Sequence, residues 1–575
     1  FRRVLFRSND CRPIWPKGIK IMENPKVYDV LAEAFKGEGV EHLFTLMGDA
    51  NMYWAQKMAD EYGVNVIHAR HEHCAAAMAD GYARATGKVG VASTTCGPGY
   101  TQIMTALTIA ARGNVPLVVF AGDSPIGAAW YLQQIDMAPL ALACGAHFVA
   151  VKSLDRLLDN VREAFHVAAT ERKPVVLSVP MDLQAQEYPY MADYTPSSDL
   201  GPIAQRPVPD PVLVERVVDM IAEAERPIIL GGRGAVRSGA REALEALADR
   251  AGALLGNSLY GKGLFDGNPY NIEIAGAFAS DFARERFSEA DLVIGVGAGL
   301  GHYTTEGGYL YPMASTIQID TNPRGLWQGL RTADLHIRAD ARAAAEAIVE
   351  AMDRRGVKKT GQRTPEMAAS ISADSPDSKV FPVQPNTVDP RKIVLELDQT
   401  IPKDWDIVVG GGHYFSMVMT HMKGRPAEKY HVVNDFGAIG SGLPAAIGIA
   451  TARGDGKVAL IEGDGSLLMH IQELETIQRH GIKLLINIMN DGGYGAEFHK
   501  FRARNIEPRQ AIHGRGDLAA TAKGFGMRSE TVNGMGQMSA FFGQHQQANI
   551  ATLWDVHTDD KIPSRAYRRV HFGEA

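Results

Sequence analysis

The stretch that decides the fold runs from residue 458 to residue 495. It begins with VALIEGDGS at Val458–Ser466 and ends with KLLINIMN at Lys483–Asn490 followed by DGGYG at Asp491–Gly495. The first apolar run stops at a Gly-Asp-Gly turn, which is typical of a buried strand. The apolar residues between the two runs recur at the spacing of one helix face: Leu467, Leu468, Ile471, Leu474 and Ile477.

Two acidic residues follow the two predicted strands of this stretch. Asp464 comes after the first strand, and Asp491 comes after the second, Leu484–Met489. A strand, a helix and a second strand of this length predict a right-handed crossover between parallel strands. Because parallel strands end at the same edge of a sheet, we expect the two carboxylates to meet in space.

A cation between the two carboxylates would remove their mutual repulsion. Oxygen ligands favour Mg²⁺, which keeps some of its waters and often binds phosphates as well. The neighbouring glycines let backbone groups approach phosphate oxygens closely. The stretch therefore indicates a site for Mg²⁺ and a phosphorylated ligand. The alternative is a pair of surface turns in a doubly wound sheet, with one Asp capping a helix.

A second motif lies near the N-terminus. Val64–Ala69 is predicted as a strand, and Arg70-His71-Glu72-His73 leads from it into a helical run that ends in ADGYARAT. Taken alone, Glu72 is interpreted as a residue that complements the positive N-terminal end of the helix.

In this order the two motifs resemble those of the thiamine diphosphate enzymes, over roughly Val27–Val556 and most closely in the acetolactate synthase branch. The resemblance implies that Asp464, Asp491 and the backbone carbonyl of Gly493 ligate Mg²⁺, although many members have Asn at the second position. It also implies that Glu72 is the catalytic glutamate. In the family this residue hydrogen-bonds to N1′ of the cofactor's aminopyrimidine ring and promotes loss of the C2 proton.

Three further blocks extend the implied cofactor site. Cys96–Gln102 is similar to the family's GPG-x-x-N loop, with Gln102 in place of Asn, and Gly411-Gly412-His413 matches the segment at the diphosphate end. Gly437–Ala446 matches the block in which an apolar wedge, here Ile439, bends the cofactor; its alternative is a place in the core. The residues that the resemblance assigns to cofactor binding are Gly97, Gly99, Gly412, His413, Ile439, Gly463, Asp464, Gly465, Ser466 and Tyr494.

Composition narrows the class of protein. The chain has 575 residues, of which 45% are hydrophobic and 22% charged, as expected of a soluble globular protein of three or four domains. The net charge of −7 gives no reason to expect nucleic acid, and no apolar stretch has transmembrane length. Four cysteines without metal-ligand or disulfide-framework spacing favour a reducing, cytoplasmic setting.

The fold class predicted is α/β, with three doubly wound parallel-sheet domains. Linkers rich in Pro and polar residues are predicted at 187–210 and 358–390. The resemblance then implies a pyrimidine-binding domain at 22–186, a central domain at 211–357 and a diphosphate- and Mg²⁺-binding domain at 391–560. The basic residues 1–21 match nothing in the family and are interpreted as a non-native or unstructured extension, with a transit peptide as the alternative.

The resemblance also implies an assembly. In the family, the residues that correspond to Glu72 and Asp464 meet across a subunit interface. We therefore expect a homodimer as the smallest active unit, or a homotetramer.

Departures from the family pattern bear on the reaction. Gln133 stands where pyruvate decarboxylases carry a His-His pair and acetolactate synthases carry Gln, which implies a catalytic role in carboligation. Thr95 replaces the catalytic His of benzoylformate decarboxylase. Against a strict acetolactate synthase, Ile439 replaces Met, and Gly297–His302 replaces the segment that holds FAD, so FAD is left open.

The expected function is decarboxylation of a 2-oxo acid with carboligation, dependent on thiamine diphosphate and Mg²⁺. The alternative is a 2-oxo acid decarboxylase or 2-hydroxy ketone lyase of the benzoylformate decarboxylase or benzaldehyde lyase type, without FAD. A nonenzymatic nucleotide-binding module would be expected to lose Glu72 or a metal carboxylate, and a dehydrogenase would need G-x-G-x-x-G between a strand and a helix. Polar candidates for the pocket rim are His71, His73, His413, Glu497 and His499.

Overall fold

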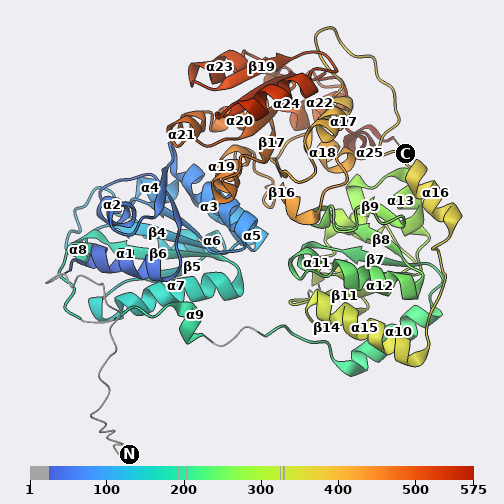
Figure 1. Ribbon diagram of the computed structural model, residues 1–575, viewed down its shortest axis with the longest axis horizontal. Helices are drawn as coiled ribbons and strands as arrows, with labels where there is room; N and C mark the ends of the chain where they lie inside the picture. Colours follow the sequence, from blue (N-terminus) through green and yellow to red (C-terminus); the bar gives the residue numbers. More distant parts are fainter. Residues whose placement is uncertain (1–24, 191–192, 202–204, 324–325, 328–329, 575) are drawn as a thin grey trace, which may run out of the picture.

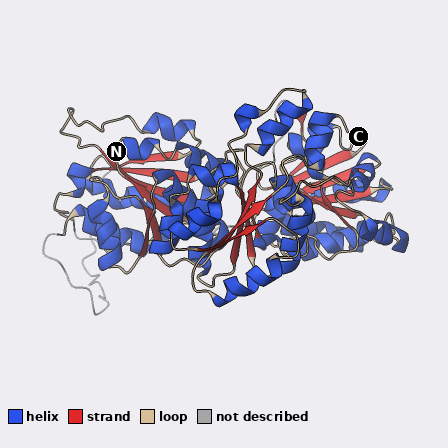
Figure 2. Cartoon of the chain, turned by 90° about the horizontal axis from the view of Figure 1, so that it is seen from above, coloured by secondary structure: helices blue, strands red, loops and turns tan. Residues whose placement is uncertain are grey.

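Each of the three regions of alternating strand and helix pattern folds around a six-stranded parallel sheet (Figure 1). The computed structural model describes residues 25–190, 193–201, 205–323, 326–327 and 330–574. Residues 1–21, which were interpreted as a non-native or unstructured extension, lie outside this part of the chain. Figure 2 shows the three sheets side by side, with helices on both faces of each. The predicted α/β class with three doubly wound sheets is confirmed.

The N-terminal sheet has the strand order β2-β1-β3-β4-β6-β5. Its strands are β1 (His42–Thr45), β2 (Asn65–His68), β3 (Gly90–Thr94), β4 (Leu117–Asp123), β5 (His147–Ala150) and β6 (Pro174–Pro180). The accompanying helices are α1 (Val27–Gly37), α2 (Met52–Asp60), α3 (Glu72–Thr86), α4 (Pro98–Thr101), α5 (Met104–Gly113), α6 (Ala138–Ala143), α7 (Leu157–Glu171), α8 (Met181–Gln184) and α9 (Ser197–Leu200).

The central sheet has the order β14-β11-β10-β7-β8-β9. Its strands are β7 (Pro227–Gly231), β8 (Leu254–Asn257), β9 (Asn271–Ile274), β10 (Leu292–Val296), β11 (Ser315–Asp320) and β14 (Leu335–Arg338), and a small antiparallel ribbon adds β12 (Leu326–Trp327) and β13 (Leu330–Arg331). Its helices are α10 (Pro211–Glu223), α11 (Arg233–Arg237), α12 (Arg241–Ala251), α13 (Asp281–Ser288), α14 (His302–Thr305), α15 (Ala341–Arg355) and α16 (Pro365–Ala373).

The C-terminal sheet has the order β16-β15-β17-β18-β20-β19, the same arrangement as the N-terminal sheet. Its strands are β15 (Asp406–Val409), β16 (Tyr430–Val432), β17 (Val458–Gly463), β18 (Leu485–Asn490), β19 (Arg528–Val532) and β20 (Thr552–His557). Its helices are α17 (Pro390–Thr400), α18 (Phe415–His421), α19 (Gly442–Arg453), α20 (Asp464–Met469), α21 (Glu473–Arg479), α22 (Gly495–Ala503), α23 (Leu518–Gly524), α24 (Met538–Gln547) and α25 (Arg565–Phe572). The first and last sheets are therefore structural copies in their topology.

The first helix beside the central sheet and the first beside the C-terminal sheet begin in the same way. The side chain of Asp210 accepts a hydrogen bond from the backbone N–H of Val212 at α10, and Asp389 does the same for Arg391 at α17. Proline occupies the first turn of both helices. An Asp cap followed by Pro satisfies a free N–H group and sets the helical φ in advance, which fixes where each helix starts.

Two local predictions differ from the structure. The helix face predicted across residues 467–477 is divided between α20 and α21, because the chain leaves helical geometry at His470 (φ −137°). Leu467, Leu474 and Ile477 are fully buried, whereas Leu468 is 44% exposed. Both segments predicted as linkers contain a helix: α9 lies within 187–210, and α16, which begins after Thr364 with Pro365 in its first turn, lies within 358–390.

The N-terminal and C-terminal sheets are joined through α3 and α19, which lie against each other in Figure 1. Glycines allow this close approach. A Cβ at Gly81 would lie 2.2 Å from the carbonyl oxygen of Ala445, and one at Gly448 would lie 1.9 Å from that of Met78. The apolar core is continuous across this contact. The two copies of the fold thus form one packed body.

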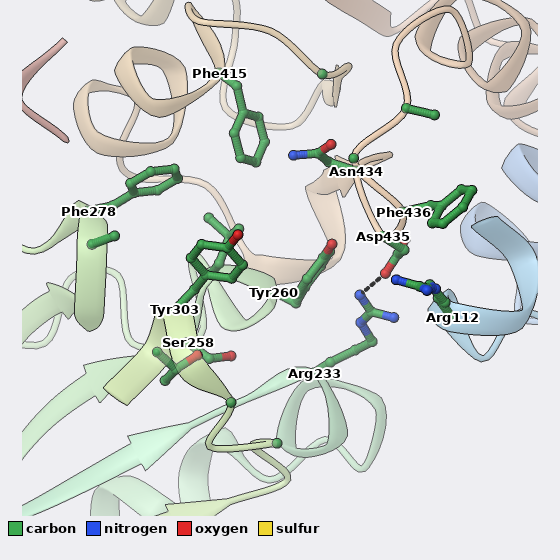
Figure 3. Close-up of a pocket in the computed structure, with 18 of the residues that line it drawn as sticks. Arg112, Arg233, Ser258, Tyr260, Phe278, Tyr303, Phe415, Asn434, Asp435 and Phe436 are labelled. Atoms are coloured by element: carbon green, nitrogen blue, oxygen red, sulfur yellow. Dashed lines mark hydrogen bonds and ion pairs between the residues drawn. The ribbon is translucent and has the colours of Figure 1, made fainter. Parts of the chain in front are cut away.

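Asp435, in the loop after β16, receives arginines from both other domains. Arg84 of α3 and Arg233 of α11 approach its carboxylate at 2.8 and 2.5 Å, and the Arg233 guanidinium also lies 3.8 Å over the Tyr260 ring (Figure 3). Although burial alone would raise the pKa of Asp435, the two arginine charges hold it below its usual range. Arg84 has a second partner in Asp80. The contact of Asp435 with Arg84 and Arg233, which joins the three domains, therefore depends on a negative charge at position 435.

Replacing Asp435 by Asn is expected to destabilise the protein by about 3 kcal/mol, because it leaves the largely buried Arg233 guanidinium without a counter-charge and Arg84 with Asp80 alone. The thermal unfolding temperature should fall accordingly. Asp159 provides a matched control: it also bridges two arginines, Arg156 and Arg162, but is 56% exposed. Asp159→Asn should change stability by less than about 0.5 kcal/mol. Equal effects of the two substitutions would contradict a structural role for the contact of Asp435 with Arg84 and Arg233.

Candidate active site

The structure brings the two acidic loops together at the carboxyl edge of the C-terminal sheet. Strands β17 and β18 are parallel, with Gly463 opposite Met489. Asp464 is the first residue of α20, and Asp491 directly follows β18. The backbone N–H of Gly492 donates to Asp464 Oδ2 at 3.0 Å. The crossover inferred from the sequence is therefore present.

The two carboxyl groups disfavour each other's charge. Burial raises the pKa of Asp464 to about 6. Burial and the neighbouring charge of Asp464 raise the pKa of Asp491 well above its usual range. A divalent cation between them would lower the pKa of both groups, because it stabilises both carboxylates.

Both carboxyl groups line a cavity of about 2310 Å³ between the C-terminal sheet, the central sheet and the end of α5. Residues that the sequence assigned to cofactor or metal binding make up much of one end of it: Gly412, His413, Ile439, Gly463, Asp464, Gly465, Ser466, Asp491, Gly493 and Tyr494. The other end, drawn in Figure 3, is lined by aromatic side chains that include Tyr260, Phe278, Tyr303, Phe415 and Phe436.

Small residues keep the first end of the cavity open. A Cβ at Gly465 would lie 2.9 Å from the Tyr494 ring, and one at Gly495 would lie 2.5 Å from Asp491 Oδ2. Ser466 Oγ accepts the backbone N–H of Gly440 at 2.7 Å, which ties the loop of Ile439 to the start of α20. These glycine-lined loops leave backbone groups accessible, as a phosphate ligand requires.

The donor set fits Mg²⁺ with a diphosphate. Among the described residues, no cluster of three or more His, Cys, Asp or Glu side chains is arranged around a metal position. Two carboxylates with a backbone carbonyl from the Gly493 loop are an incomplete set of hard oxygen ligands. Mg²⁺ is commonly held in this way, with its remaining positions filled by phosphate oxygens and water.

Glu462 lies beneath these loops and is fully buried. Its Oε1 accepts a hydrogen bond from Ser466 Oγ at 2.6 Å, and its carboxyl group is packed so closely against Gly410 that a Cβ there would lie 2.1 Å from Oε1. Burial raises the pKa of Glu462 to about 7. The folded protein therefore keeps this proton at pH values where the unfolded chain loses it.

Glu462 should make stability fall as pH rises from about 4.5 to about 7, because the folded state binds the extra proton over that window. The full effect is about 3 kcal/mol and is complete above pH 7. Glu462→Gln has no carboxyl group to titrate at this position, so its stability does not include this pH-dependent loss. The unfolding temperature of the variant minus that of wild type should therefore rise from pH 5 to pH 8. A difference that does not change with pH would contradict the assignment.

The residues assigned in the first domain gather at the carboxyl edge of the N-terminal sheet. Glu72 is the first residue of α3, and a Cβ at Gly99 would lie 3.3 Å from its Oε1. Gly97, with φ +57°, packs against the backbone of Gln133, whose carbonyl oxygen would be 2.3 Å from a Cβ there. The thiol of Cys96 donates to Gln133 Oε1 at 3.2 Å. Glu72, Gly97, Gly99 and Gln133 thus form one group.

This group is separate from the cavity within one chain. Of the described residues that line the cavity, none is Glu72, Gly97, Gly99 or Gln133. Large apolar side chains flank the group and are exposed: Trp130 at 82% and Leu132 at 96%. The predicted site residues therefore form two half-sites, one on each terminal sheet.

The predicted rim residues fall into different environments. His73 is buried, shares a hydrogen bond of 3.0 Å with Ser441 Oγ, and stacks on His470, which marks a domain contact. His499 is buried against the ring of His413 at 4.2 Å, and burial lowers its pKa below the usual range. Glu497 lies on the cavity wall.

Several residues that line the cavity were not predicted from the sequence. Asn434 and Asp435 line the cavity just before the Gly437 block, where their polar pair could have been noticed. Tyr567 and His571 of α25 also line it, and no pattern in the sequence pointed to them.

Comparisons with known proteins give one consistent family. Three family models match in order: "Thiamine pyrophosphate enzyme, N-terminal TPP binding domain" at residues 25–140, the central domain at 214–348, and the "C-terminal TPP binding domain" at 410–554. Thiamine pyrophosphate is another name for thiamine diphosphate.

Curated relatives and solved structures agree with these models. The acetolactate synthase large subunit of Parasynechococcus marenigrum is 28% identical over 545 residues, covering 92% of this chain and 86% of the relative. The acetolactate synthase isozyme 2 large subunit of Escherichia coli is 28% identical, covering 92% and 95%. The thiamine diphosphate-dependent 4-hydroxybenzoylformate decarboxylase of Rhodococcus jostii RHA1 has a TM-score of 0.78 at 22% identity, covering 93% and 99%. That structural likeness is one of fold. None of the described helices is long and apolar enough to cross a membrane.

Proposed function

This chain belongs to the thiamine pyrophosphate enzymes, and we propose that it uses thiamine diphosphate and Mg²⁺ to decarboxylate a 2-oxo acid and to join the product to a second carbonyl compound. The observation that carries the proposal is the presence of both half-sites, Glu72 on one terminal sheet and the Asp464–Asp491 pair on the other. The match to acetolactate synthases over 92% of the chain supports carboligation.

The cofactor, when bound, supplies a nucleophilic carbon and accepts the electrons released when CO₂ leaves the substrate. The chain's residues do the rest. Asp464, Asp491 and the Gly493 carbonyl would hold Mg²⁺ and through it the diphosphate. The carboxyl group of Glu72 would hold the proton that is exchanged with the pyrimidine ring. Gln133 would orient the substrate with its amide group, which the Cys96 thiol fixes from one side.

We further propose that the active unit is a homodimer in which the Glu72 half-site of one copy faces the Asp464 half-site of the other. The separation of the two groups within one chain supports this arrangement. Exposed apolar side chains at both half-sites support it as well: Trp130 and Leu132 beside Gln133, and Leu468 and Met469 at the end of α20. Such surfaces are typical of subunit contacts.

The competing function is decarboxylation without ligation. The observation that favours it is Ile439 on the cavity wall, in place of the Met of acetolactate synthases. Whether FAD binds also bears on the choice between these two functions. The half of the cavity beside the central sheet has room for a second ligand. Its wall includes Gly297 and residues 299–302, which differ from the segment that holds FAD in acetolactate synthases.

A panel of 2-oxo acids, each supplied with and without a carbonyl acceptor, tests the proposal. With thiamine diphosphate and Mg²⁺, we expect CO₂ release and a coupled product that retains the acceptor carbon skeleton. CO₂ with only the free aldehyde would establish the competing function, and no CO₂ from any 2-oxo acid would refute both. The absorption spectrum of the purified protein tests whether FAD is bound: flavin bands would show that it is.

A further inference from the structure

The end of the chain reaches the candidate cofactor site. Residues 563–574 lie beyond the family match, which stops at residue 554. The segment turns into α25, and Tyr567 on that helix lines the cavity. Arg568 anchors the helix, since its guanidinium pairs with Asp377 at 2.9 Å and with Glu574 at 2.7 Å. A part of the chain outside the matched domains is thus fixed against the site.

The anchored segment makes one directed contact with His413. The backbone N–H of Ser564 donates to His413 Nε2 at 2.9 Å, and both residues are buried. A backbone N–H can only donate a hydrogen bond. The Nε2 atom must therefore be the unprotonated nitrogen of the ring, and protonating it would break the contact.

The ring proton of His413 then has one remaining position, Nδ1. No hydrogen-bond partner for Nδ1 is found among the described residues, and His413 lines the cavity. The ring is held in place by His499, 4.2 Å away between centroids, and by the edge-on ring of Tyr567 at 4.9 Å. The site therefore presents a fixed N–H donor to whatever occupies this end of the cavity.

We propose that Ser564 is a positioning residue, whose backbone locks His413 as the Nδ1–H tautomer so that its N–H donates to an anionic phosphate oxygen. The identity of that oxygen as part of a diphosphate rests on the proposed function. The locked tautomer also has a negative consequence. A protonated Nδ1 cannot ligate a metal, so His413 is excluded from the Mg²⁺ ligands.

Nitrogen-15 NMR of the imidazole rings in the 575-residue chain without cofactor tests the tautomer directly. We expect the His413 signals, identified by their loss in His413→Gln, to show a protonated Nδ1 and an unprotonated Nε2. The chain supplies both references. His421 Nδ1 lies 2.9 Å from the Met417 carbonyl, which requires Nδ1–H, whereas His71 Nδ1 accepts the His73 N–H, which requires Nε2–H. A His413 signal of the His71 type would overturn the proposal.

Calorimetry with thiamine diphosphate and Mg²⁺ tests the role of the donor. In His413→Asn the amide nitrogen can take the place of Nδ1, whereas in His413→Gln the amide reaches only the position of Nε2. We expect both variants to bind more weakly than wild type, with His413→Gln weaker than His413→Asn by about tenfold or more. Equal affinities, or the reverse order, would overturn the donor role while leaving the proposed function intact. Absence of binding in wild type would instead refute the proposed function, and the NMR result would still stand.

Discussion

Replacing Glu72 by Gln is expected to lower kcat by about a hundredfold to ten-thousandfold, the range associated with loss of a positioned general acid–base group. The change is small in structure, since Glu72 is half-buried at the start of α3 and Gln has the same shape. The unfolding temperature should therefore stay within a few degrees of wild type. The loss arises because an amide cannot pass a proton to the pyrimidine ring.

Steady-state assays of CO₂ release, with cofactor at saturation, measure this effect. Glu41→Gln serves as the control, because Glu41 is an exposed glutamate of the same domain that pairs with Lys88. It should leave turnover close to wild type. Turnover in Glu72→Gln comparable to that control would remove Glu72 from the mechanism.

Replacing Asp464 by Ala is expected to weaken binding of thiamine diphosphate with Mg²⁺ by more than about a hundredfold, the upper range for residues that only support a metal ligand. Stability without cofactor should not fall, since the substitution removes one of two buried carboxyl groups that disfavour each other. A loss of affinity without a loss of stability separates metal binding from a structural role.

Isothermal calorimetry in the presence and absence of Mg²⁺ measures the binding, and thermal unfolding measures the stability. Asp404→Ala is a suitable control, because Asp404 belongs to the same domain but is 59% exposed and pairs with Lys457. Two outcomes would refute the metal site. Asp464→Ala could bind thiamine diphosphate as tightly as Asp404→Ala does, or Asp464→Ala and wild type could bind it equally tightly when Mg²⁺ is present.

The same two variants together test the shared site. If Glu72 and Asp464 of different copies form each site, a mixed dimer of Glu72→Gln and Asp464→Ala contains one intact pair. Random exchange of subunits would then restore about a quarter of the wild-type sites. If both residues act within one chain, mixing the two inactive proteins would restore nothing.

Much of the C-terminal half-site was predictable because the signals are local. The apolar runs that became β17 and β18 are continuous and stop close to glycines, and the parallel pairing of the two strands then places Asp464 beside Asp491. The break between α20 and α21 was not predictable in this way. Leu468 and Ile471 fit a helical spacing, but packing buries Leu467 and leaves the side chain of Leu468 44% exposed.

The order of strands and helices, the acidic loops and the place of Glu72 at the start of α3 were determined by the sequence itself, since each depends on residues close together in the chain. Only the tertiary structure decided which groups meet across the domains. Asp435 receives Arg84 and Arg233, and Ser564 holds His413, although 151 positions separate the last two. Such contacts form because separately folded surfaces are packed together, and that packing leaves no periodic pattern in the sequence from which they could be predicted.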